Sequence, residues 1–327
     1  MKLTIVILNW NGKLLLKKFL PKIILYTPKT PIYIVDNSSK DGSIEFINKE
    51  YKDIRIIKLP KNTGYAKAYN YALKEIHSDV YCLINNDVMV TKNWTLPIMS
   101  HFEKRKVDIA QPLILDFNNK KRFEYAGAGG GYIDKFGYPF CRGRIFNNIE
   151  DNNGQYDNSI NIFWASGACM FVNQKSWISL GGFDEDFFMH QEEIDFCWRA
   201  KNINKVVMCI SESKVYHVGS GSKLSSHDKI YFNHRNSLLT LVKNVNRKNL
   251  TFVLVVRTFF ELISIFFYLF KGKIIKSLMI LKSYFSFILL FAKFYRKRQN
   301  SCSIKYYKRV SIVFDSFILN KNKFSDF

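Results

Sequence analysis

The chain has 327 residues, of which 47% are hydrophobic and 16% aromatic, and its formal net charge is +22 at pH 7. This length and composition exclude general disorder, because they supply enough apolar side chains for a large core. The charge favours polyanionic partners, which include nucleic acid, anionic lipid headgroups and phosphorylated substrates. The six cysteines contain no C-x-x-C pair, which argues against a zinc knuckle or a disulfide framework.

The first part of the chain alternates apolar strands with helical segments. Residues 3–8 form a continuous apolar run, as expected for a buried parallel strand, and the run is too short for a secretory signal. It stops at Asn9 and Trp10, and a helical segment follows. Residues 31–35 form a second predicted strand, which ends at Asp36 before another helix. This repetition predicts an α/β fold with a mostly parallel, Rossmann-like sheet.

The third unit repeats the same order. Residues 54–59 form the predicted strand, and Asn62 and Gly64 then open a helix over residues 65–76. The N-terminus of this helix would face the same edge of the sheet as the preceding polar strand ends. Helix N-termini favour phosphate, so we expect a phosphate group near this edge.

The fourth predicted strand, residues 80–84, ends abruptly in Asn85, Asn86 and Asp87. In an open α/β sheet, ligands bind beyond the carboxyl ends of the strands, which places Asp87 at the binding edge. Carboxylate and amide oxygens suit Mg²⁺ or Mn²⁺ that holds phosphates. Such clusters are also ordinary turn chemistry, so the motif alone leaves both interpretations open.

Helical and strand periodicity is lost over residues 117–159, where a glycine run spans residues 127–131. A dinucleotide-binding loop would need a buried strand before the glycines and a helix after them. We expect a flexible hairpin or a loop on the substrate side instead. Residues 162–172 form a further predicted strand, whose small central residues would let another backbone or a ligand approach closely.

An acidic segment follows, at the start of a helix predicted to begin near Gln191. Glu192 and Asp195 are three residues apart and share a face of that helix, while Glu193 points elsewhere. One carboxylate can therefore face a substrate while the others hold structure. A carboxylate beside an anionic phosphate site has a raised proton affinity, which suits a general base. Acidic residues at a helix start also stabilise the helix dipole, which is the structural alternative.

The last part of this region contains two predicted strands, residues 205–208 and 214–218. The second strand carries His217 into a glycine- and serine-rich stretch, residues 219–222. A helix over residues 228–244 follows and carries Arg235 and Asn236.

The chain changes character after Asn249. Residues 251–270 are almost wholly apolar except for Arg257 and Glu261, which are four apart and can pair on one helical face. The segment is about long enough to cross a bilayer, but an ion pair inside a lone span is costly. Residues 283–294 form a second, shorter apolar stretch with basic flanks. We expect helices that lie in the membrane interface, with a spanning helix and a buried helical cap as the alternatives.

Taken together, seven motifs in order resemble those of the inverting family 2 glycosyltransferases with the GT-A fold, especially rhamnosyltransferase-like members from bacteria and archaea. The resemblance covers about residues 3–245. The motifs are Ile7-Leu8-Asn9-Trp10-Asn11, Val35-Asp36-Asn37-Ser38-Ser39, Asn62-Thr63-Gly64-Tyr65-Ala66 with Asn70, Leu83-Ile84-Asn85-Asn86-Asp87, Ser166-Gly167-Ala168, Gly181-Gly182-Phe183-Asp184-Glu185 and Glu192-Glu193-Ile194-Asp195 with Trp198-Arg199.

The resemblance implies transfer of a sugar from a nucleoside-diphosphate donor to an acceptor hydroxyl, with inversion at the anomeric carbon. Asp36 matches the position that reads the nucleobase. The nucleotide-sugar site that we predict comprises Asn9, Trp10, Asp36, Asn62, Gly64, Asn86 and Arg235.

The resemblance also implies a divalent metal, Mg²⁺ or Mn²⁺, held by Asp87, Asn85 and His217. Asn85 stands where the family's Asp-x-Asp motif usually has its first Asp, so Asp87 should carry most of the metal binding. A structural histidine is the alternative role for His217.

For catalysis, the resemblance places Glu193 where the family's base is often Asp. Glu192 is the alternative base, and Asp195 is the third catalytic candidate. Trp164 and Gly167 are the candidate acceptor residues.

These inferences predict a GT-A domain over residues 1–245, a membrane-associating helical segment over 246–300 and a basic tail over 301–327. We expect a cytoplasmic enzyme attached peripherally to the inner face of the cell membrane. It would act in polysaccharide, glycolipid or lipid-linked glycan synthesis, with rhamnose as the candidate sugar. Its expected partners are the donor, a glycan or lipid-linked acceptor and an anionic membrane surface, with no nucleic acid.

Two other functions compete with this interpretation. A sugar-phosphate nucleotidyltransferase would carry a glycine-rich, basic loop after its first strand, and Asn9-Trp10-Asn11-Gly12 is not such a loop. A non-catalytic basic module that binds membrane or nucleic acid would explain the charge, but the chain shows no nucleic-acid motif.

Overall fold

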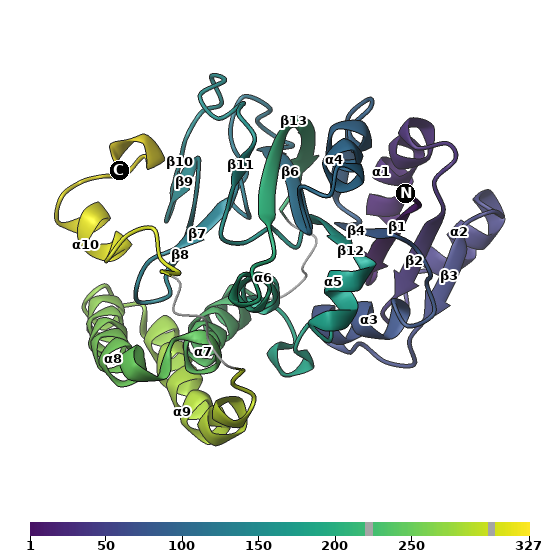
Figure 1. Ribbon diagram of the computed structural model, residues 1–327. Coiled ribbons are helices and arrows are strands. Elements are labelled where there is room, and N and C mark those ends of the chain that lie inside the picture. The colour runs from purple at the N-terminus through teal and green to yellow at the C-terminus, as the bar shows by residue number, and fades with distance from the viewer. Residues whose placement is uncertain (220–224, 300–304) are drawn as a thin grey trace.

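The computed structural model describes residues 1–219, 225–299 and 305–327 (Figure 1). The serine and glycine residues 220–222, the end of the predicted 246–300 segment and the start of the 301–327 tail lie partly or wholly outside the described residues. The body of the molecule is a nine-stranded sheet in the order β11-β13-β6-β12-β4-β1-β2-β3, with β5 paired to β13.

Most strands of this sheet run in one direction, which confirms the predicted mostly parallel α/β fold. Four of them are parallel neighbours in the order β3 (Arg55–Lys58), β2 (Ile32–Asp36), β1 (Leu3–Asn9) and β4 (Val80–Asn85). β12 (Cys169–Asn173) runs antiparallel between β4 and β6 (Ile109–Asp116). β13 (Val207–His217) is parallel to β6, and β5 (Val88–Val90) and β11 (Ile160–Asn161) pair with it antiparallel.

Three predicted boundaries were wrong. The strands predicted over residues 205–208 and 214–218 are one strand, β13, whose register with β6 shifts between Ile210 and Lys214. The strand predicted over residues 162–172 starts only at Cys169, because Trp164 bridges to Gly131 outside the main sheet. The helix predicted over residues 65–76 is α3 (Gly64–Ala72).

Helices cover both faces of the main sheet, as the alternation of side chains along β1 shows. Ile5 and Ile7 pack in one apolar cluster with α1 (Lys13–Tyr26), α2 (Ser43–Glu50) and α4 (Thr95–Glu103). Val6, which points to the opposite face, packs in a second cluster with α3, α5 (Gln174–Ser179) and α6 (Glu192–Asn202). The polar strand ends are therefore carried on a core that is buried on both sides.

The region predicted to be irregular, residues 117–159, contains a small antiparallel sheet. Its strands are β7 (Gly131–Ile133), β8 (Pro139–Cys141), β9 (Arg144–Ile145) and β10 (Asn148–Ile149). The C-terminal segment, with α10 (Ile312–Phe317) and the short helix Phe324–Asp326, packs against it. The Phe324 ring lies 5.3 Å from the Tyr132 ring, and Ile312 N–H donates to Asp134. The tail is therefore part of the folded body.

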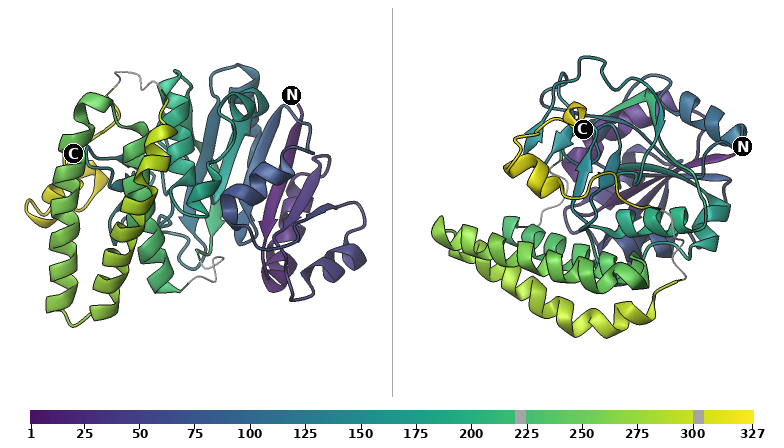
Figure 2. Two further views of the ribbon diagram at one scale, coloured as in Figure 1. Left: turned by 90° about the horizontal axis from the view of Figure 1, so that it is seen from below. Right: turned by 60° about the vertical axis from the view of Figure 1, so that its left-hand side comes forward.

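Three long helices form a bundle beside the sheet. They are α7 (Ser226–Asn244), α8 (Arg247–Phe270) and α9 (Ile274–Arg296). Figure 2 shows α8 and α9 lying side by side along one flank of the molecule. Leu239 and Val242 of α7 pack with Phe294 of α9 and with Phe187, which belongs to the loop before α6. The bundle is thus joined to the body next to the predicted catalytic helix.

The predicted pairing of Arg257 with Glu261 is confirmed, with Nε and Oε1 2.8 Å apart. Both side chains are buried, and Arg257 also donates to the carbonyl oxygen of Phe136 and to Ser237. The ion pair therefore faces the protein. The second apolar stretch is longer than predicted, because α9 continues through Lys276 and Lys282 over 23 residues.

Candidate active site

The ends of β1, β2 and β4 bring Asn9, Asp36 and Asn86 together in one buried group, which we call the strand-end network. The amide nitrogen of Asn9 lies 3.3 Å from Asp36 Oδ1, and its amide oxygen accepts a 2.8 Å hydrogen bond from Asn86. Parallel pairing places Asn9 beside Asp36, so the contact follows from the register of the sheet. All three side chains are less than 10% exposed.

A second polar group joins the end of β2 to the start of α3. Asn37 donates to Asn62 Oδ1 at 2.9 Å and accepts from Thr63 N–H at 2.9 Å. Asn62 Oδ1 also accepts from Gly64 N–H, and Tyr65 N–H donates to the carbonyl oxygen of Phe188. Three backbone N–H groups at this helix N-terminus, where we predicted a phosphate group, therefore already bond to protein acceptors.

Asp87 follows Asn86 in the chain and contacts His217, which the antiparallel pairing of β13 with β5 brings close to it. The Nε2 atom of His217 is 3.1 Å from Asp87 Oδ1, and its Nδ1 atom is 3.3 Å from Glu124 Oε1. All three side chains are buried. Burial opposes the charged imidazolium, but the hydrogen bonds to Asp87 and Glu124 outweigh it and raise the pKa of His217 to about 10.

The chemistry of this group fits a divalent metal whose remaining ligands come from a substrate. Among residues 1–219, 225–299 and 305–327, no set of three or more His, Cys, Asp and Glu side chains is arranged to hold a metal. Mg²⁺-type sites are commonly built from one or two carboxylates plus substrate phosphates, and Asp87 supplies one such carboxylate. Glu124 beside Nδ1 turns Nε2 of His217 toward Asp87, as carboxylates do for ligating histidines. Metal binding would release the imidazole proton.

Asn85, the other predicted metal ligand, is half-buried at the end of β4.

Glu192 and Glu193 open α6 behind Gln191, whose backbone φ is 74°. One side-chain oxygen of each glutamate is buried and has no hydrogen-bond partner among the residues that the structure describes. Buried polar atoms in native proteins are nearly always paired, so two such oxygens side by side indicate a place for a ligand that donates hydrogen bonds. The loop that precedes them contacts the start of α3 through Tyr65, which places the pair next to the polar groups described above.

Both glutamates hold protons more strongly than free carboxyl groups do. Burial and the charge of Glu193 raise the pKa of Glu192 well above its usual value. Burial raises the pKa of Glu193 to about 7, although the backbone N–H groups of Glu193 and Gln191 oppose the shift. A carboxylate with a pKa near neutrality accepts a proton efficiently at physiological pH, which is the property that a general base needs.

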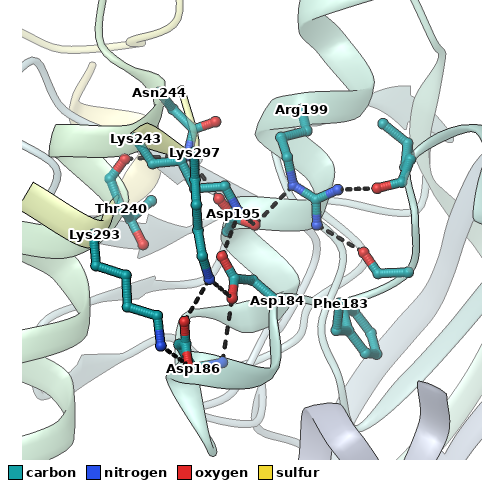
Figure 3. Close-up of polar contacts among 12 residues, drawn as sticks. Phe183, Asp184, Asp186, Asp195, Arg199, Thr240, Lys243, Asn244, Lys293 and Lys297 are labelled. Carbon is teal, nitrogen blue, oxygen red and sulfur yellow. Dashed lines mark hydrogen bonds and ion pairs between the residues drawn. The ribbon is translucent and has the colours of Figure 1, made fainter. Parts of the chain in front are cut away.

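Asp195 occupies a different environment, shown in Figure 3. Its carboxylate accepts hydrogen bonds from Arg199 at 2.8 Å, Lys243 at 2.9 Å and Asn244 at 2.8 Å. Burial alone would raise the pKa of Asp195, but the charges of Lys243 and Arg199 lower it to about 2. Asp195 therefore stays ionised and joins α6 to α7, and a weak base of this kind is poorly suited to take a proton.

The ion pairs extend from Asp195 to α9. Lys243 also bonds Asp184 at 2.8 Å, and Lys297 bonds both Asp184 and Asp186 (Figure 3). Lys293, which is more exposed, bonds Asp186 at 2.7 Å. Basic residues of the bundle thus neutralise acidic residues that precede α6.

Arg235 is buried on α7 and points into this same region. Its guanidinium donates to Asn236 Oδ1 at 2.8 Å and to the carbonyl oxygen of Phe187 at 3.2 Å, and it lies over the Phe232 ring. These contacts connect Arg235 to the loop before α6.

The two candidate acceptor residues have different surroundings. Gly167 is half-buried, and its carbonyl oxygen accepts a 2.6 Å hydrogen bond from the Tyr65 hydroxyl. Burial, Tyr69 and the charges of Glu192 and Glu193 raise the pKa of Tyr65, so Gly167 and the glutamates lie near one another. Trp164 is buried against Gly131, and its indole N–H donates to the carbonyl oxygen of Tyr132.

The structure thus brings most of the predicted residues into two neighbouring groups, one at the strand ends and one at the start of α6. Trp164, which is buried against Gly131, belongs to neither group, and Trp10 is half-buried directly after β1. Asn37, Glu124, Tyr65, Asn236 and Lys243 complete these groups but had no predicted role. Asn37 and Tyr65 lie inside motifs that the sequence already showed, and Asn236 follows the predicted residue Arg235. Glu124 stands in the irregular region, where no local pattern could reveal it.

A mostly parallel sheet with polar groups at its strand ends and a carboxylate pair beside them is typical of glycosyltransferases of the GT-A fold. Residues 4–176 match the Glycosyl transferase family 2, and the chain belongs to that family. It is therefore a glycosyltransferase, as predicted.

The chain is similar in sequence to curated relatives and in structure to solved proteins. The chain is 25% identical to the low-salt glycan biosynthesis hexosyltransferase Agl10 of Haloferax volcanii over 72% of this chain and 74% of that protein. It is 22% identical to an N-acetylglucosaminyl-diphospho-decaprenol L-rhamnosyltransferase of Mycobacterium tuberculosis, over 62% and 71% of the two chains. It matches the structure of GalNAc-T7 with UDP, GalNAc and Mn²⁺ with a TM-score of 0.58 and 14% identity. That match covers 76% of this chain but only 48% of the GalNAc-T7 chain.

Proposed function

We propose that this chain transfers a sugar from a nucleoside-diphosphate donor to an acceptor hydroxyl with inversion, and that Glu193 is the general base. The observation that carries this proposal is the pair Glu192 and Glu193, each with a buried side-chain oxygen that has no partner within residues 1–219, 225–299 and 305–327. An acceptor hydroxyl would supply the missing donor. Glu193 is favoured over Glu192 because it is the more exposed of the two and has its pKa near neutrality.

In the proposed reaction, the acceptor hydroxyl donates a hydrogen bond to Glu193 and gives up its proton to that carboxylate. The acceptor oxygen forms a bond with the anomeric carbon as the bond from that carbon to the diphosphate oxygen breaks. The electron pair of the broken bond leaves with the nucleoside diphosphate. Attack on the face opposite the leaving group inverts the anomeric centre.

The strand-end network and the adjacent Asn62 and Gly64 would bind the nucleotide, with Asp36 toward the nucleobase. Asp87, Asn85 and His217 would hold Mg²⁺ or Mn²⁺, which would neutralise charge on the departing diphosphate. In this proposal, Asp195 positions α6, Trp164 supports the loop at Gly131, and Gly167 lies beside the acceptor.

The relatives support a hexose or deoxyhexose donor and a glycan acceptor. One relative carries the name of a hexosyltransferase in glycan biosynthesis, and another carries the name of a rhamnosyltransferase that acts on a lipid-linked sugar. We therefore propose rhamnose as the first sugar to test and a lipid-linked glycan as the acceptor.

We further propose that α8 and α9 lie in the interface of an anionic membrane. The most apolar 18-residue stretch of each helix has a mean hydropathy of 2.0 in α8 and 1.8 in α9. Only 28% of that stretch in α8, and 22% in α9, is buried. Phe259, Phe266 and Phe285 are more than half exposed, whereas the ion pair of Arg257 and Glu261 faces α7. Residues 247–298 contain a single acidic residue, Glu261, among many Lys and Arg, so the charge complements anionic headgroups.

This arrangement supports a catalytic domain over residues 1–245 and a membrane-associating segment over 246–300, on the cytoplasmic side where nucleotide sugars are made. Sedimentation with vesicles tests the membrane step. The protein should pellet with vesicles that contain anionic lipid. A double variant that carries both Phe259→Glu and Phe285→Glu should not pellet with them. Pelleting of the double variant at the wild-type level would contradict the proposed surface.

The reaction is tested with purified protein, a panel of sugar nucleotides that includes dTDP-rhamnose, UDP-N-acetylglucosamine and GDP-mannose, and N-acetylglucosaminyl-diphospho-decaprenol as acceptor. Release of nucleoside diphosphate from one donor, lost on chelation and in Asp87→Ala, would establish the class. The absence of both release and metal-dependent nucleotide binding for every donor would overturn the proposal.

A further inference from the structure

The loop before the two glutamates has an unfavourable backbone. We call residues 186–191 the base loop. Phe188, His190 and Gln191 have φ values of 63°, 65° and 74°, a region that only glycine enters without steric cost. Three such residues within four positions do not persist without restraint from the surrounding structure. The base loop is therefore held in place by contacts elsewhere in the fold.

A single side chain contacts three backbone carbonyl groups of this loop. The amide nitrogen of Asn236, on α7, lies 3.0 Å from the carbonyl oxygen of Phe187, 2.8 Å from that of Met189 and 2.8 Å from that of His190. Asn236 is fully buried. An amide has two hydrogens, so three acceptors share them and no other ligand can use them.

Arg235 fixes which way the Asn236 amide faces. Its Nε atom donates to Asn236 Oδ1 at 2.8 Å, so the nitrogen of the amide must point at the loop. Its terminal nitrogen also donates to the carbonyl oxygen of Phe187. The two neighbouring residues of α7 act on the base loop as one unit.

The opposite side of the base loop rests on the start of α3. Tyr65 N–H donates to the carbonyl oxygen of Phe188 at 2.8 Å. A Cβ atom at Gly64 would lie 2.4 Å from that oxygen, so the absence of a side chain at Gly64 permits the contact. The base loop is thus clamped between α7 and the nucleotide side of the site.

We propose that Asn236 is a positioning residue that holds the general base in place through the base loop. The proposal rests on the proposed function, because it assigns the proton acceptor to the Glu192 and Glu193 pair. Gln191 is both the last residue of the loop and the N-cap of α6, so relaxation of its φ would rotate the first turn of the helix.

The rest of α6 has its own anchor. Asp195, one turn further along, stays bonded to Arg199, Lys243 and Asn244 whether or not Asn236 is present. Loss of the Asn236 amide should therefore displace the carboxylates of Glu192 and Glu193 while the helix and the sheet persist. The expected consequence is slower chemistry in a folded protein that still binds its donor.

The experiment compares Asn236→Ala with Ser237→Ala, a buried polar residue on the same helix that bonds Arg257 and not the base loop. The readouts are kcat and KM with the active donor of the panel, and binding of the matching nucleoside diphosphate by calorimetry. Asn236→Ala should lower kcat about 100-fold, the scale of a misplaced catalytic group, with nucleotide affinity changed less than about threefold. Ser237→Ala should retain kcat.

A rescue distinguishes positioning from general loss of structure. In the Asn236→Ala background, Gln191→Gly should recover about tenfold in kcat, because glycine adopts a φ of 74° without steric cost. Folded Asn236→Ala with wild-type kcat, or a loss confined to nucleotide affinity, would overturn the proposal.

Arg235→Lys provides a second variant if Asn236→Ala does not fold. Lysine keeps the positive charge but cannot hold Asn236 Oδ1 and the Phe187 carbonyl oxygen together, so kcat should fall about tenfold with nucleotide affinity unchanged. A fall in nucleotide affinity with kcat unchanged would instead assign Arg235 to the diphosphate and overturn the proposal.

The same assays separate this inference from the proposed function. If Glu193→Gln and Glu192→Gln both transfer at the wild-type rate, the assignment of the base is wrong and the inference falls with it. If Glu193→Gln is inactive while Asn236→Ala and Arg235→Lys keep the wild-type kcat, the base stands and only the positioning role is wrong.

Discussion

The two halves of the candidate site are built in opposite ways. In the strand-end network, the side chains of Asn9, Asp36 and Asn86 bond to one another, and their positions follow from the pairing of parallel strands. In the base loop the backbone is strained, and directly after it Glu192 and Glu193 each have a buried oxygen with no partner among the described residues. The first half is a rigid surface on which a ligand can rest, whereas the second stores unfavourable interactions that a substrate can relieve.

The two halves of the candidate site are also held in place by different parts of the fold. The strand-end network is held by the sheet itself. The base loop is held by Asn236 of α7 and by Lys297, which follows α9 and bonds Asp186. Lys243 of α7 holds the residues on either side of the loop, Asp184 and Asp195. Changes in the bundle should therefore affect the chemical step and the stability of α6, while changes at the strand ends should affect donor binding.

The largest expected effect is on the base. Glu193→Gln should lower kcat about 1000-fold, because general-base catalysis contributes roughly 100- to 10,000-fold and an amide cannot accept the proton. Nucleotide affinity, measured by calorimetry, should stay within about threefold of wild type. Glu192→Gln should cost less. The opposite ranking of the two variants would move the base to Glu192.

The next effect concerns the buried ion pairs that anchor α6 and the residues before it. Lys243→Met should lower the free energy of unfolding by about 3 kcal/mol, because it leaves Asp195 and Asp184 buried with fewer counter-charges. Lys293→Met is the matched control. It removes an exposed pair with Asp186 and should change stability by less than about 0.5 kcal/mol. Equal losses in urea unfolding would contradict the assigned difference between the two lysines.

A comparable effect should appear on the nucleotide side. Asp87→Ala should weaken Mn²⁺-dependent binding of the nucleoside diphosphate about 100-fold, because one carboxylate supplies most of the protein's charge toward the metal. Binding without metal should change little. If calorimetry shows the same Mn²⁺ dependence in wild type and Asp87→Ala, the metal is held elsewhere.

The dependence on pH should report the Glu193 carboxyl. Its pKa is raised to about 7, and the base works when deprotonated, so kcat/KM should fall tenfold per pH unit below pH about 7 and level off above it. Stability should respond in the opposite sense. Between the usual pKa of 4.5 and about 7, the folded protein binds more protons than the unfolded chain, so this group's contribution to stability falls as pH rises. A flat profile from pH 5 to 8 would exclude Glu193.

The strand-end network was predictable because its signals are local. Asn9, Asp36 and Asn86 each end an apolar run, and the carboxyl ends of parallel strands share one edge. The mostly parallel sheet and the pairing of Arg257 with Glu261 followed from the same kind of short-range pattern. The long helix α9 was underestimated because Lys276 and Lys282 interrupt its apolar run.

The base loop and the start of α6 that follows it were predictable only in part. The sequence placed the acidic cluster at a helix start, but it could not separate the ionised Asp195 from the protonatable Glu193. That distinction depends on Lys243 and Arg199, which the fold brings to Asp195 and not to the glutamates. The loop's strain and its restraint by Asn236, 46 to 49 residues away, have no signature along the chain.

The central claim is that Glu193 and the strand ends together perform a transfer with inversion. The most direct measurement is the anomeric configuration of the product, read by NMR from the one-bond carbon–proton coupling at the transferred sugar. The account predicts that the product has the configuration opposite to the donor, and that Glu193→Gln forms almost none of it. A product with the donor's configuration would contradict a single displacement with Glu193 as base.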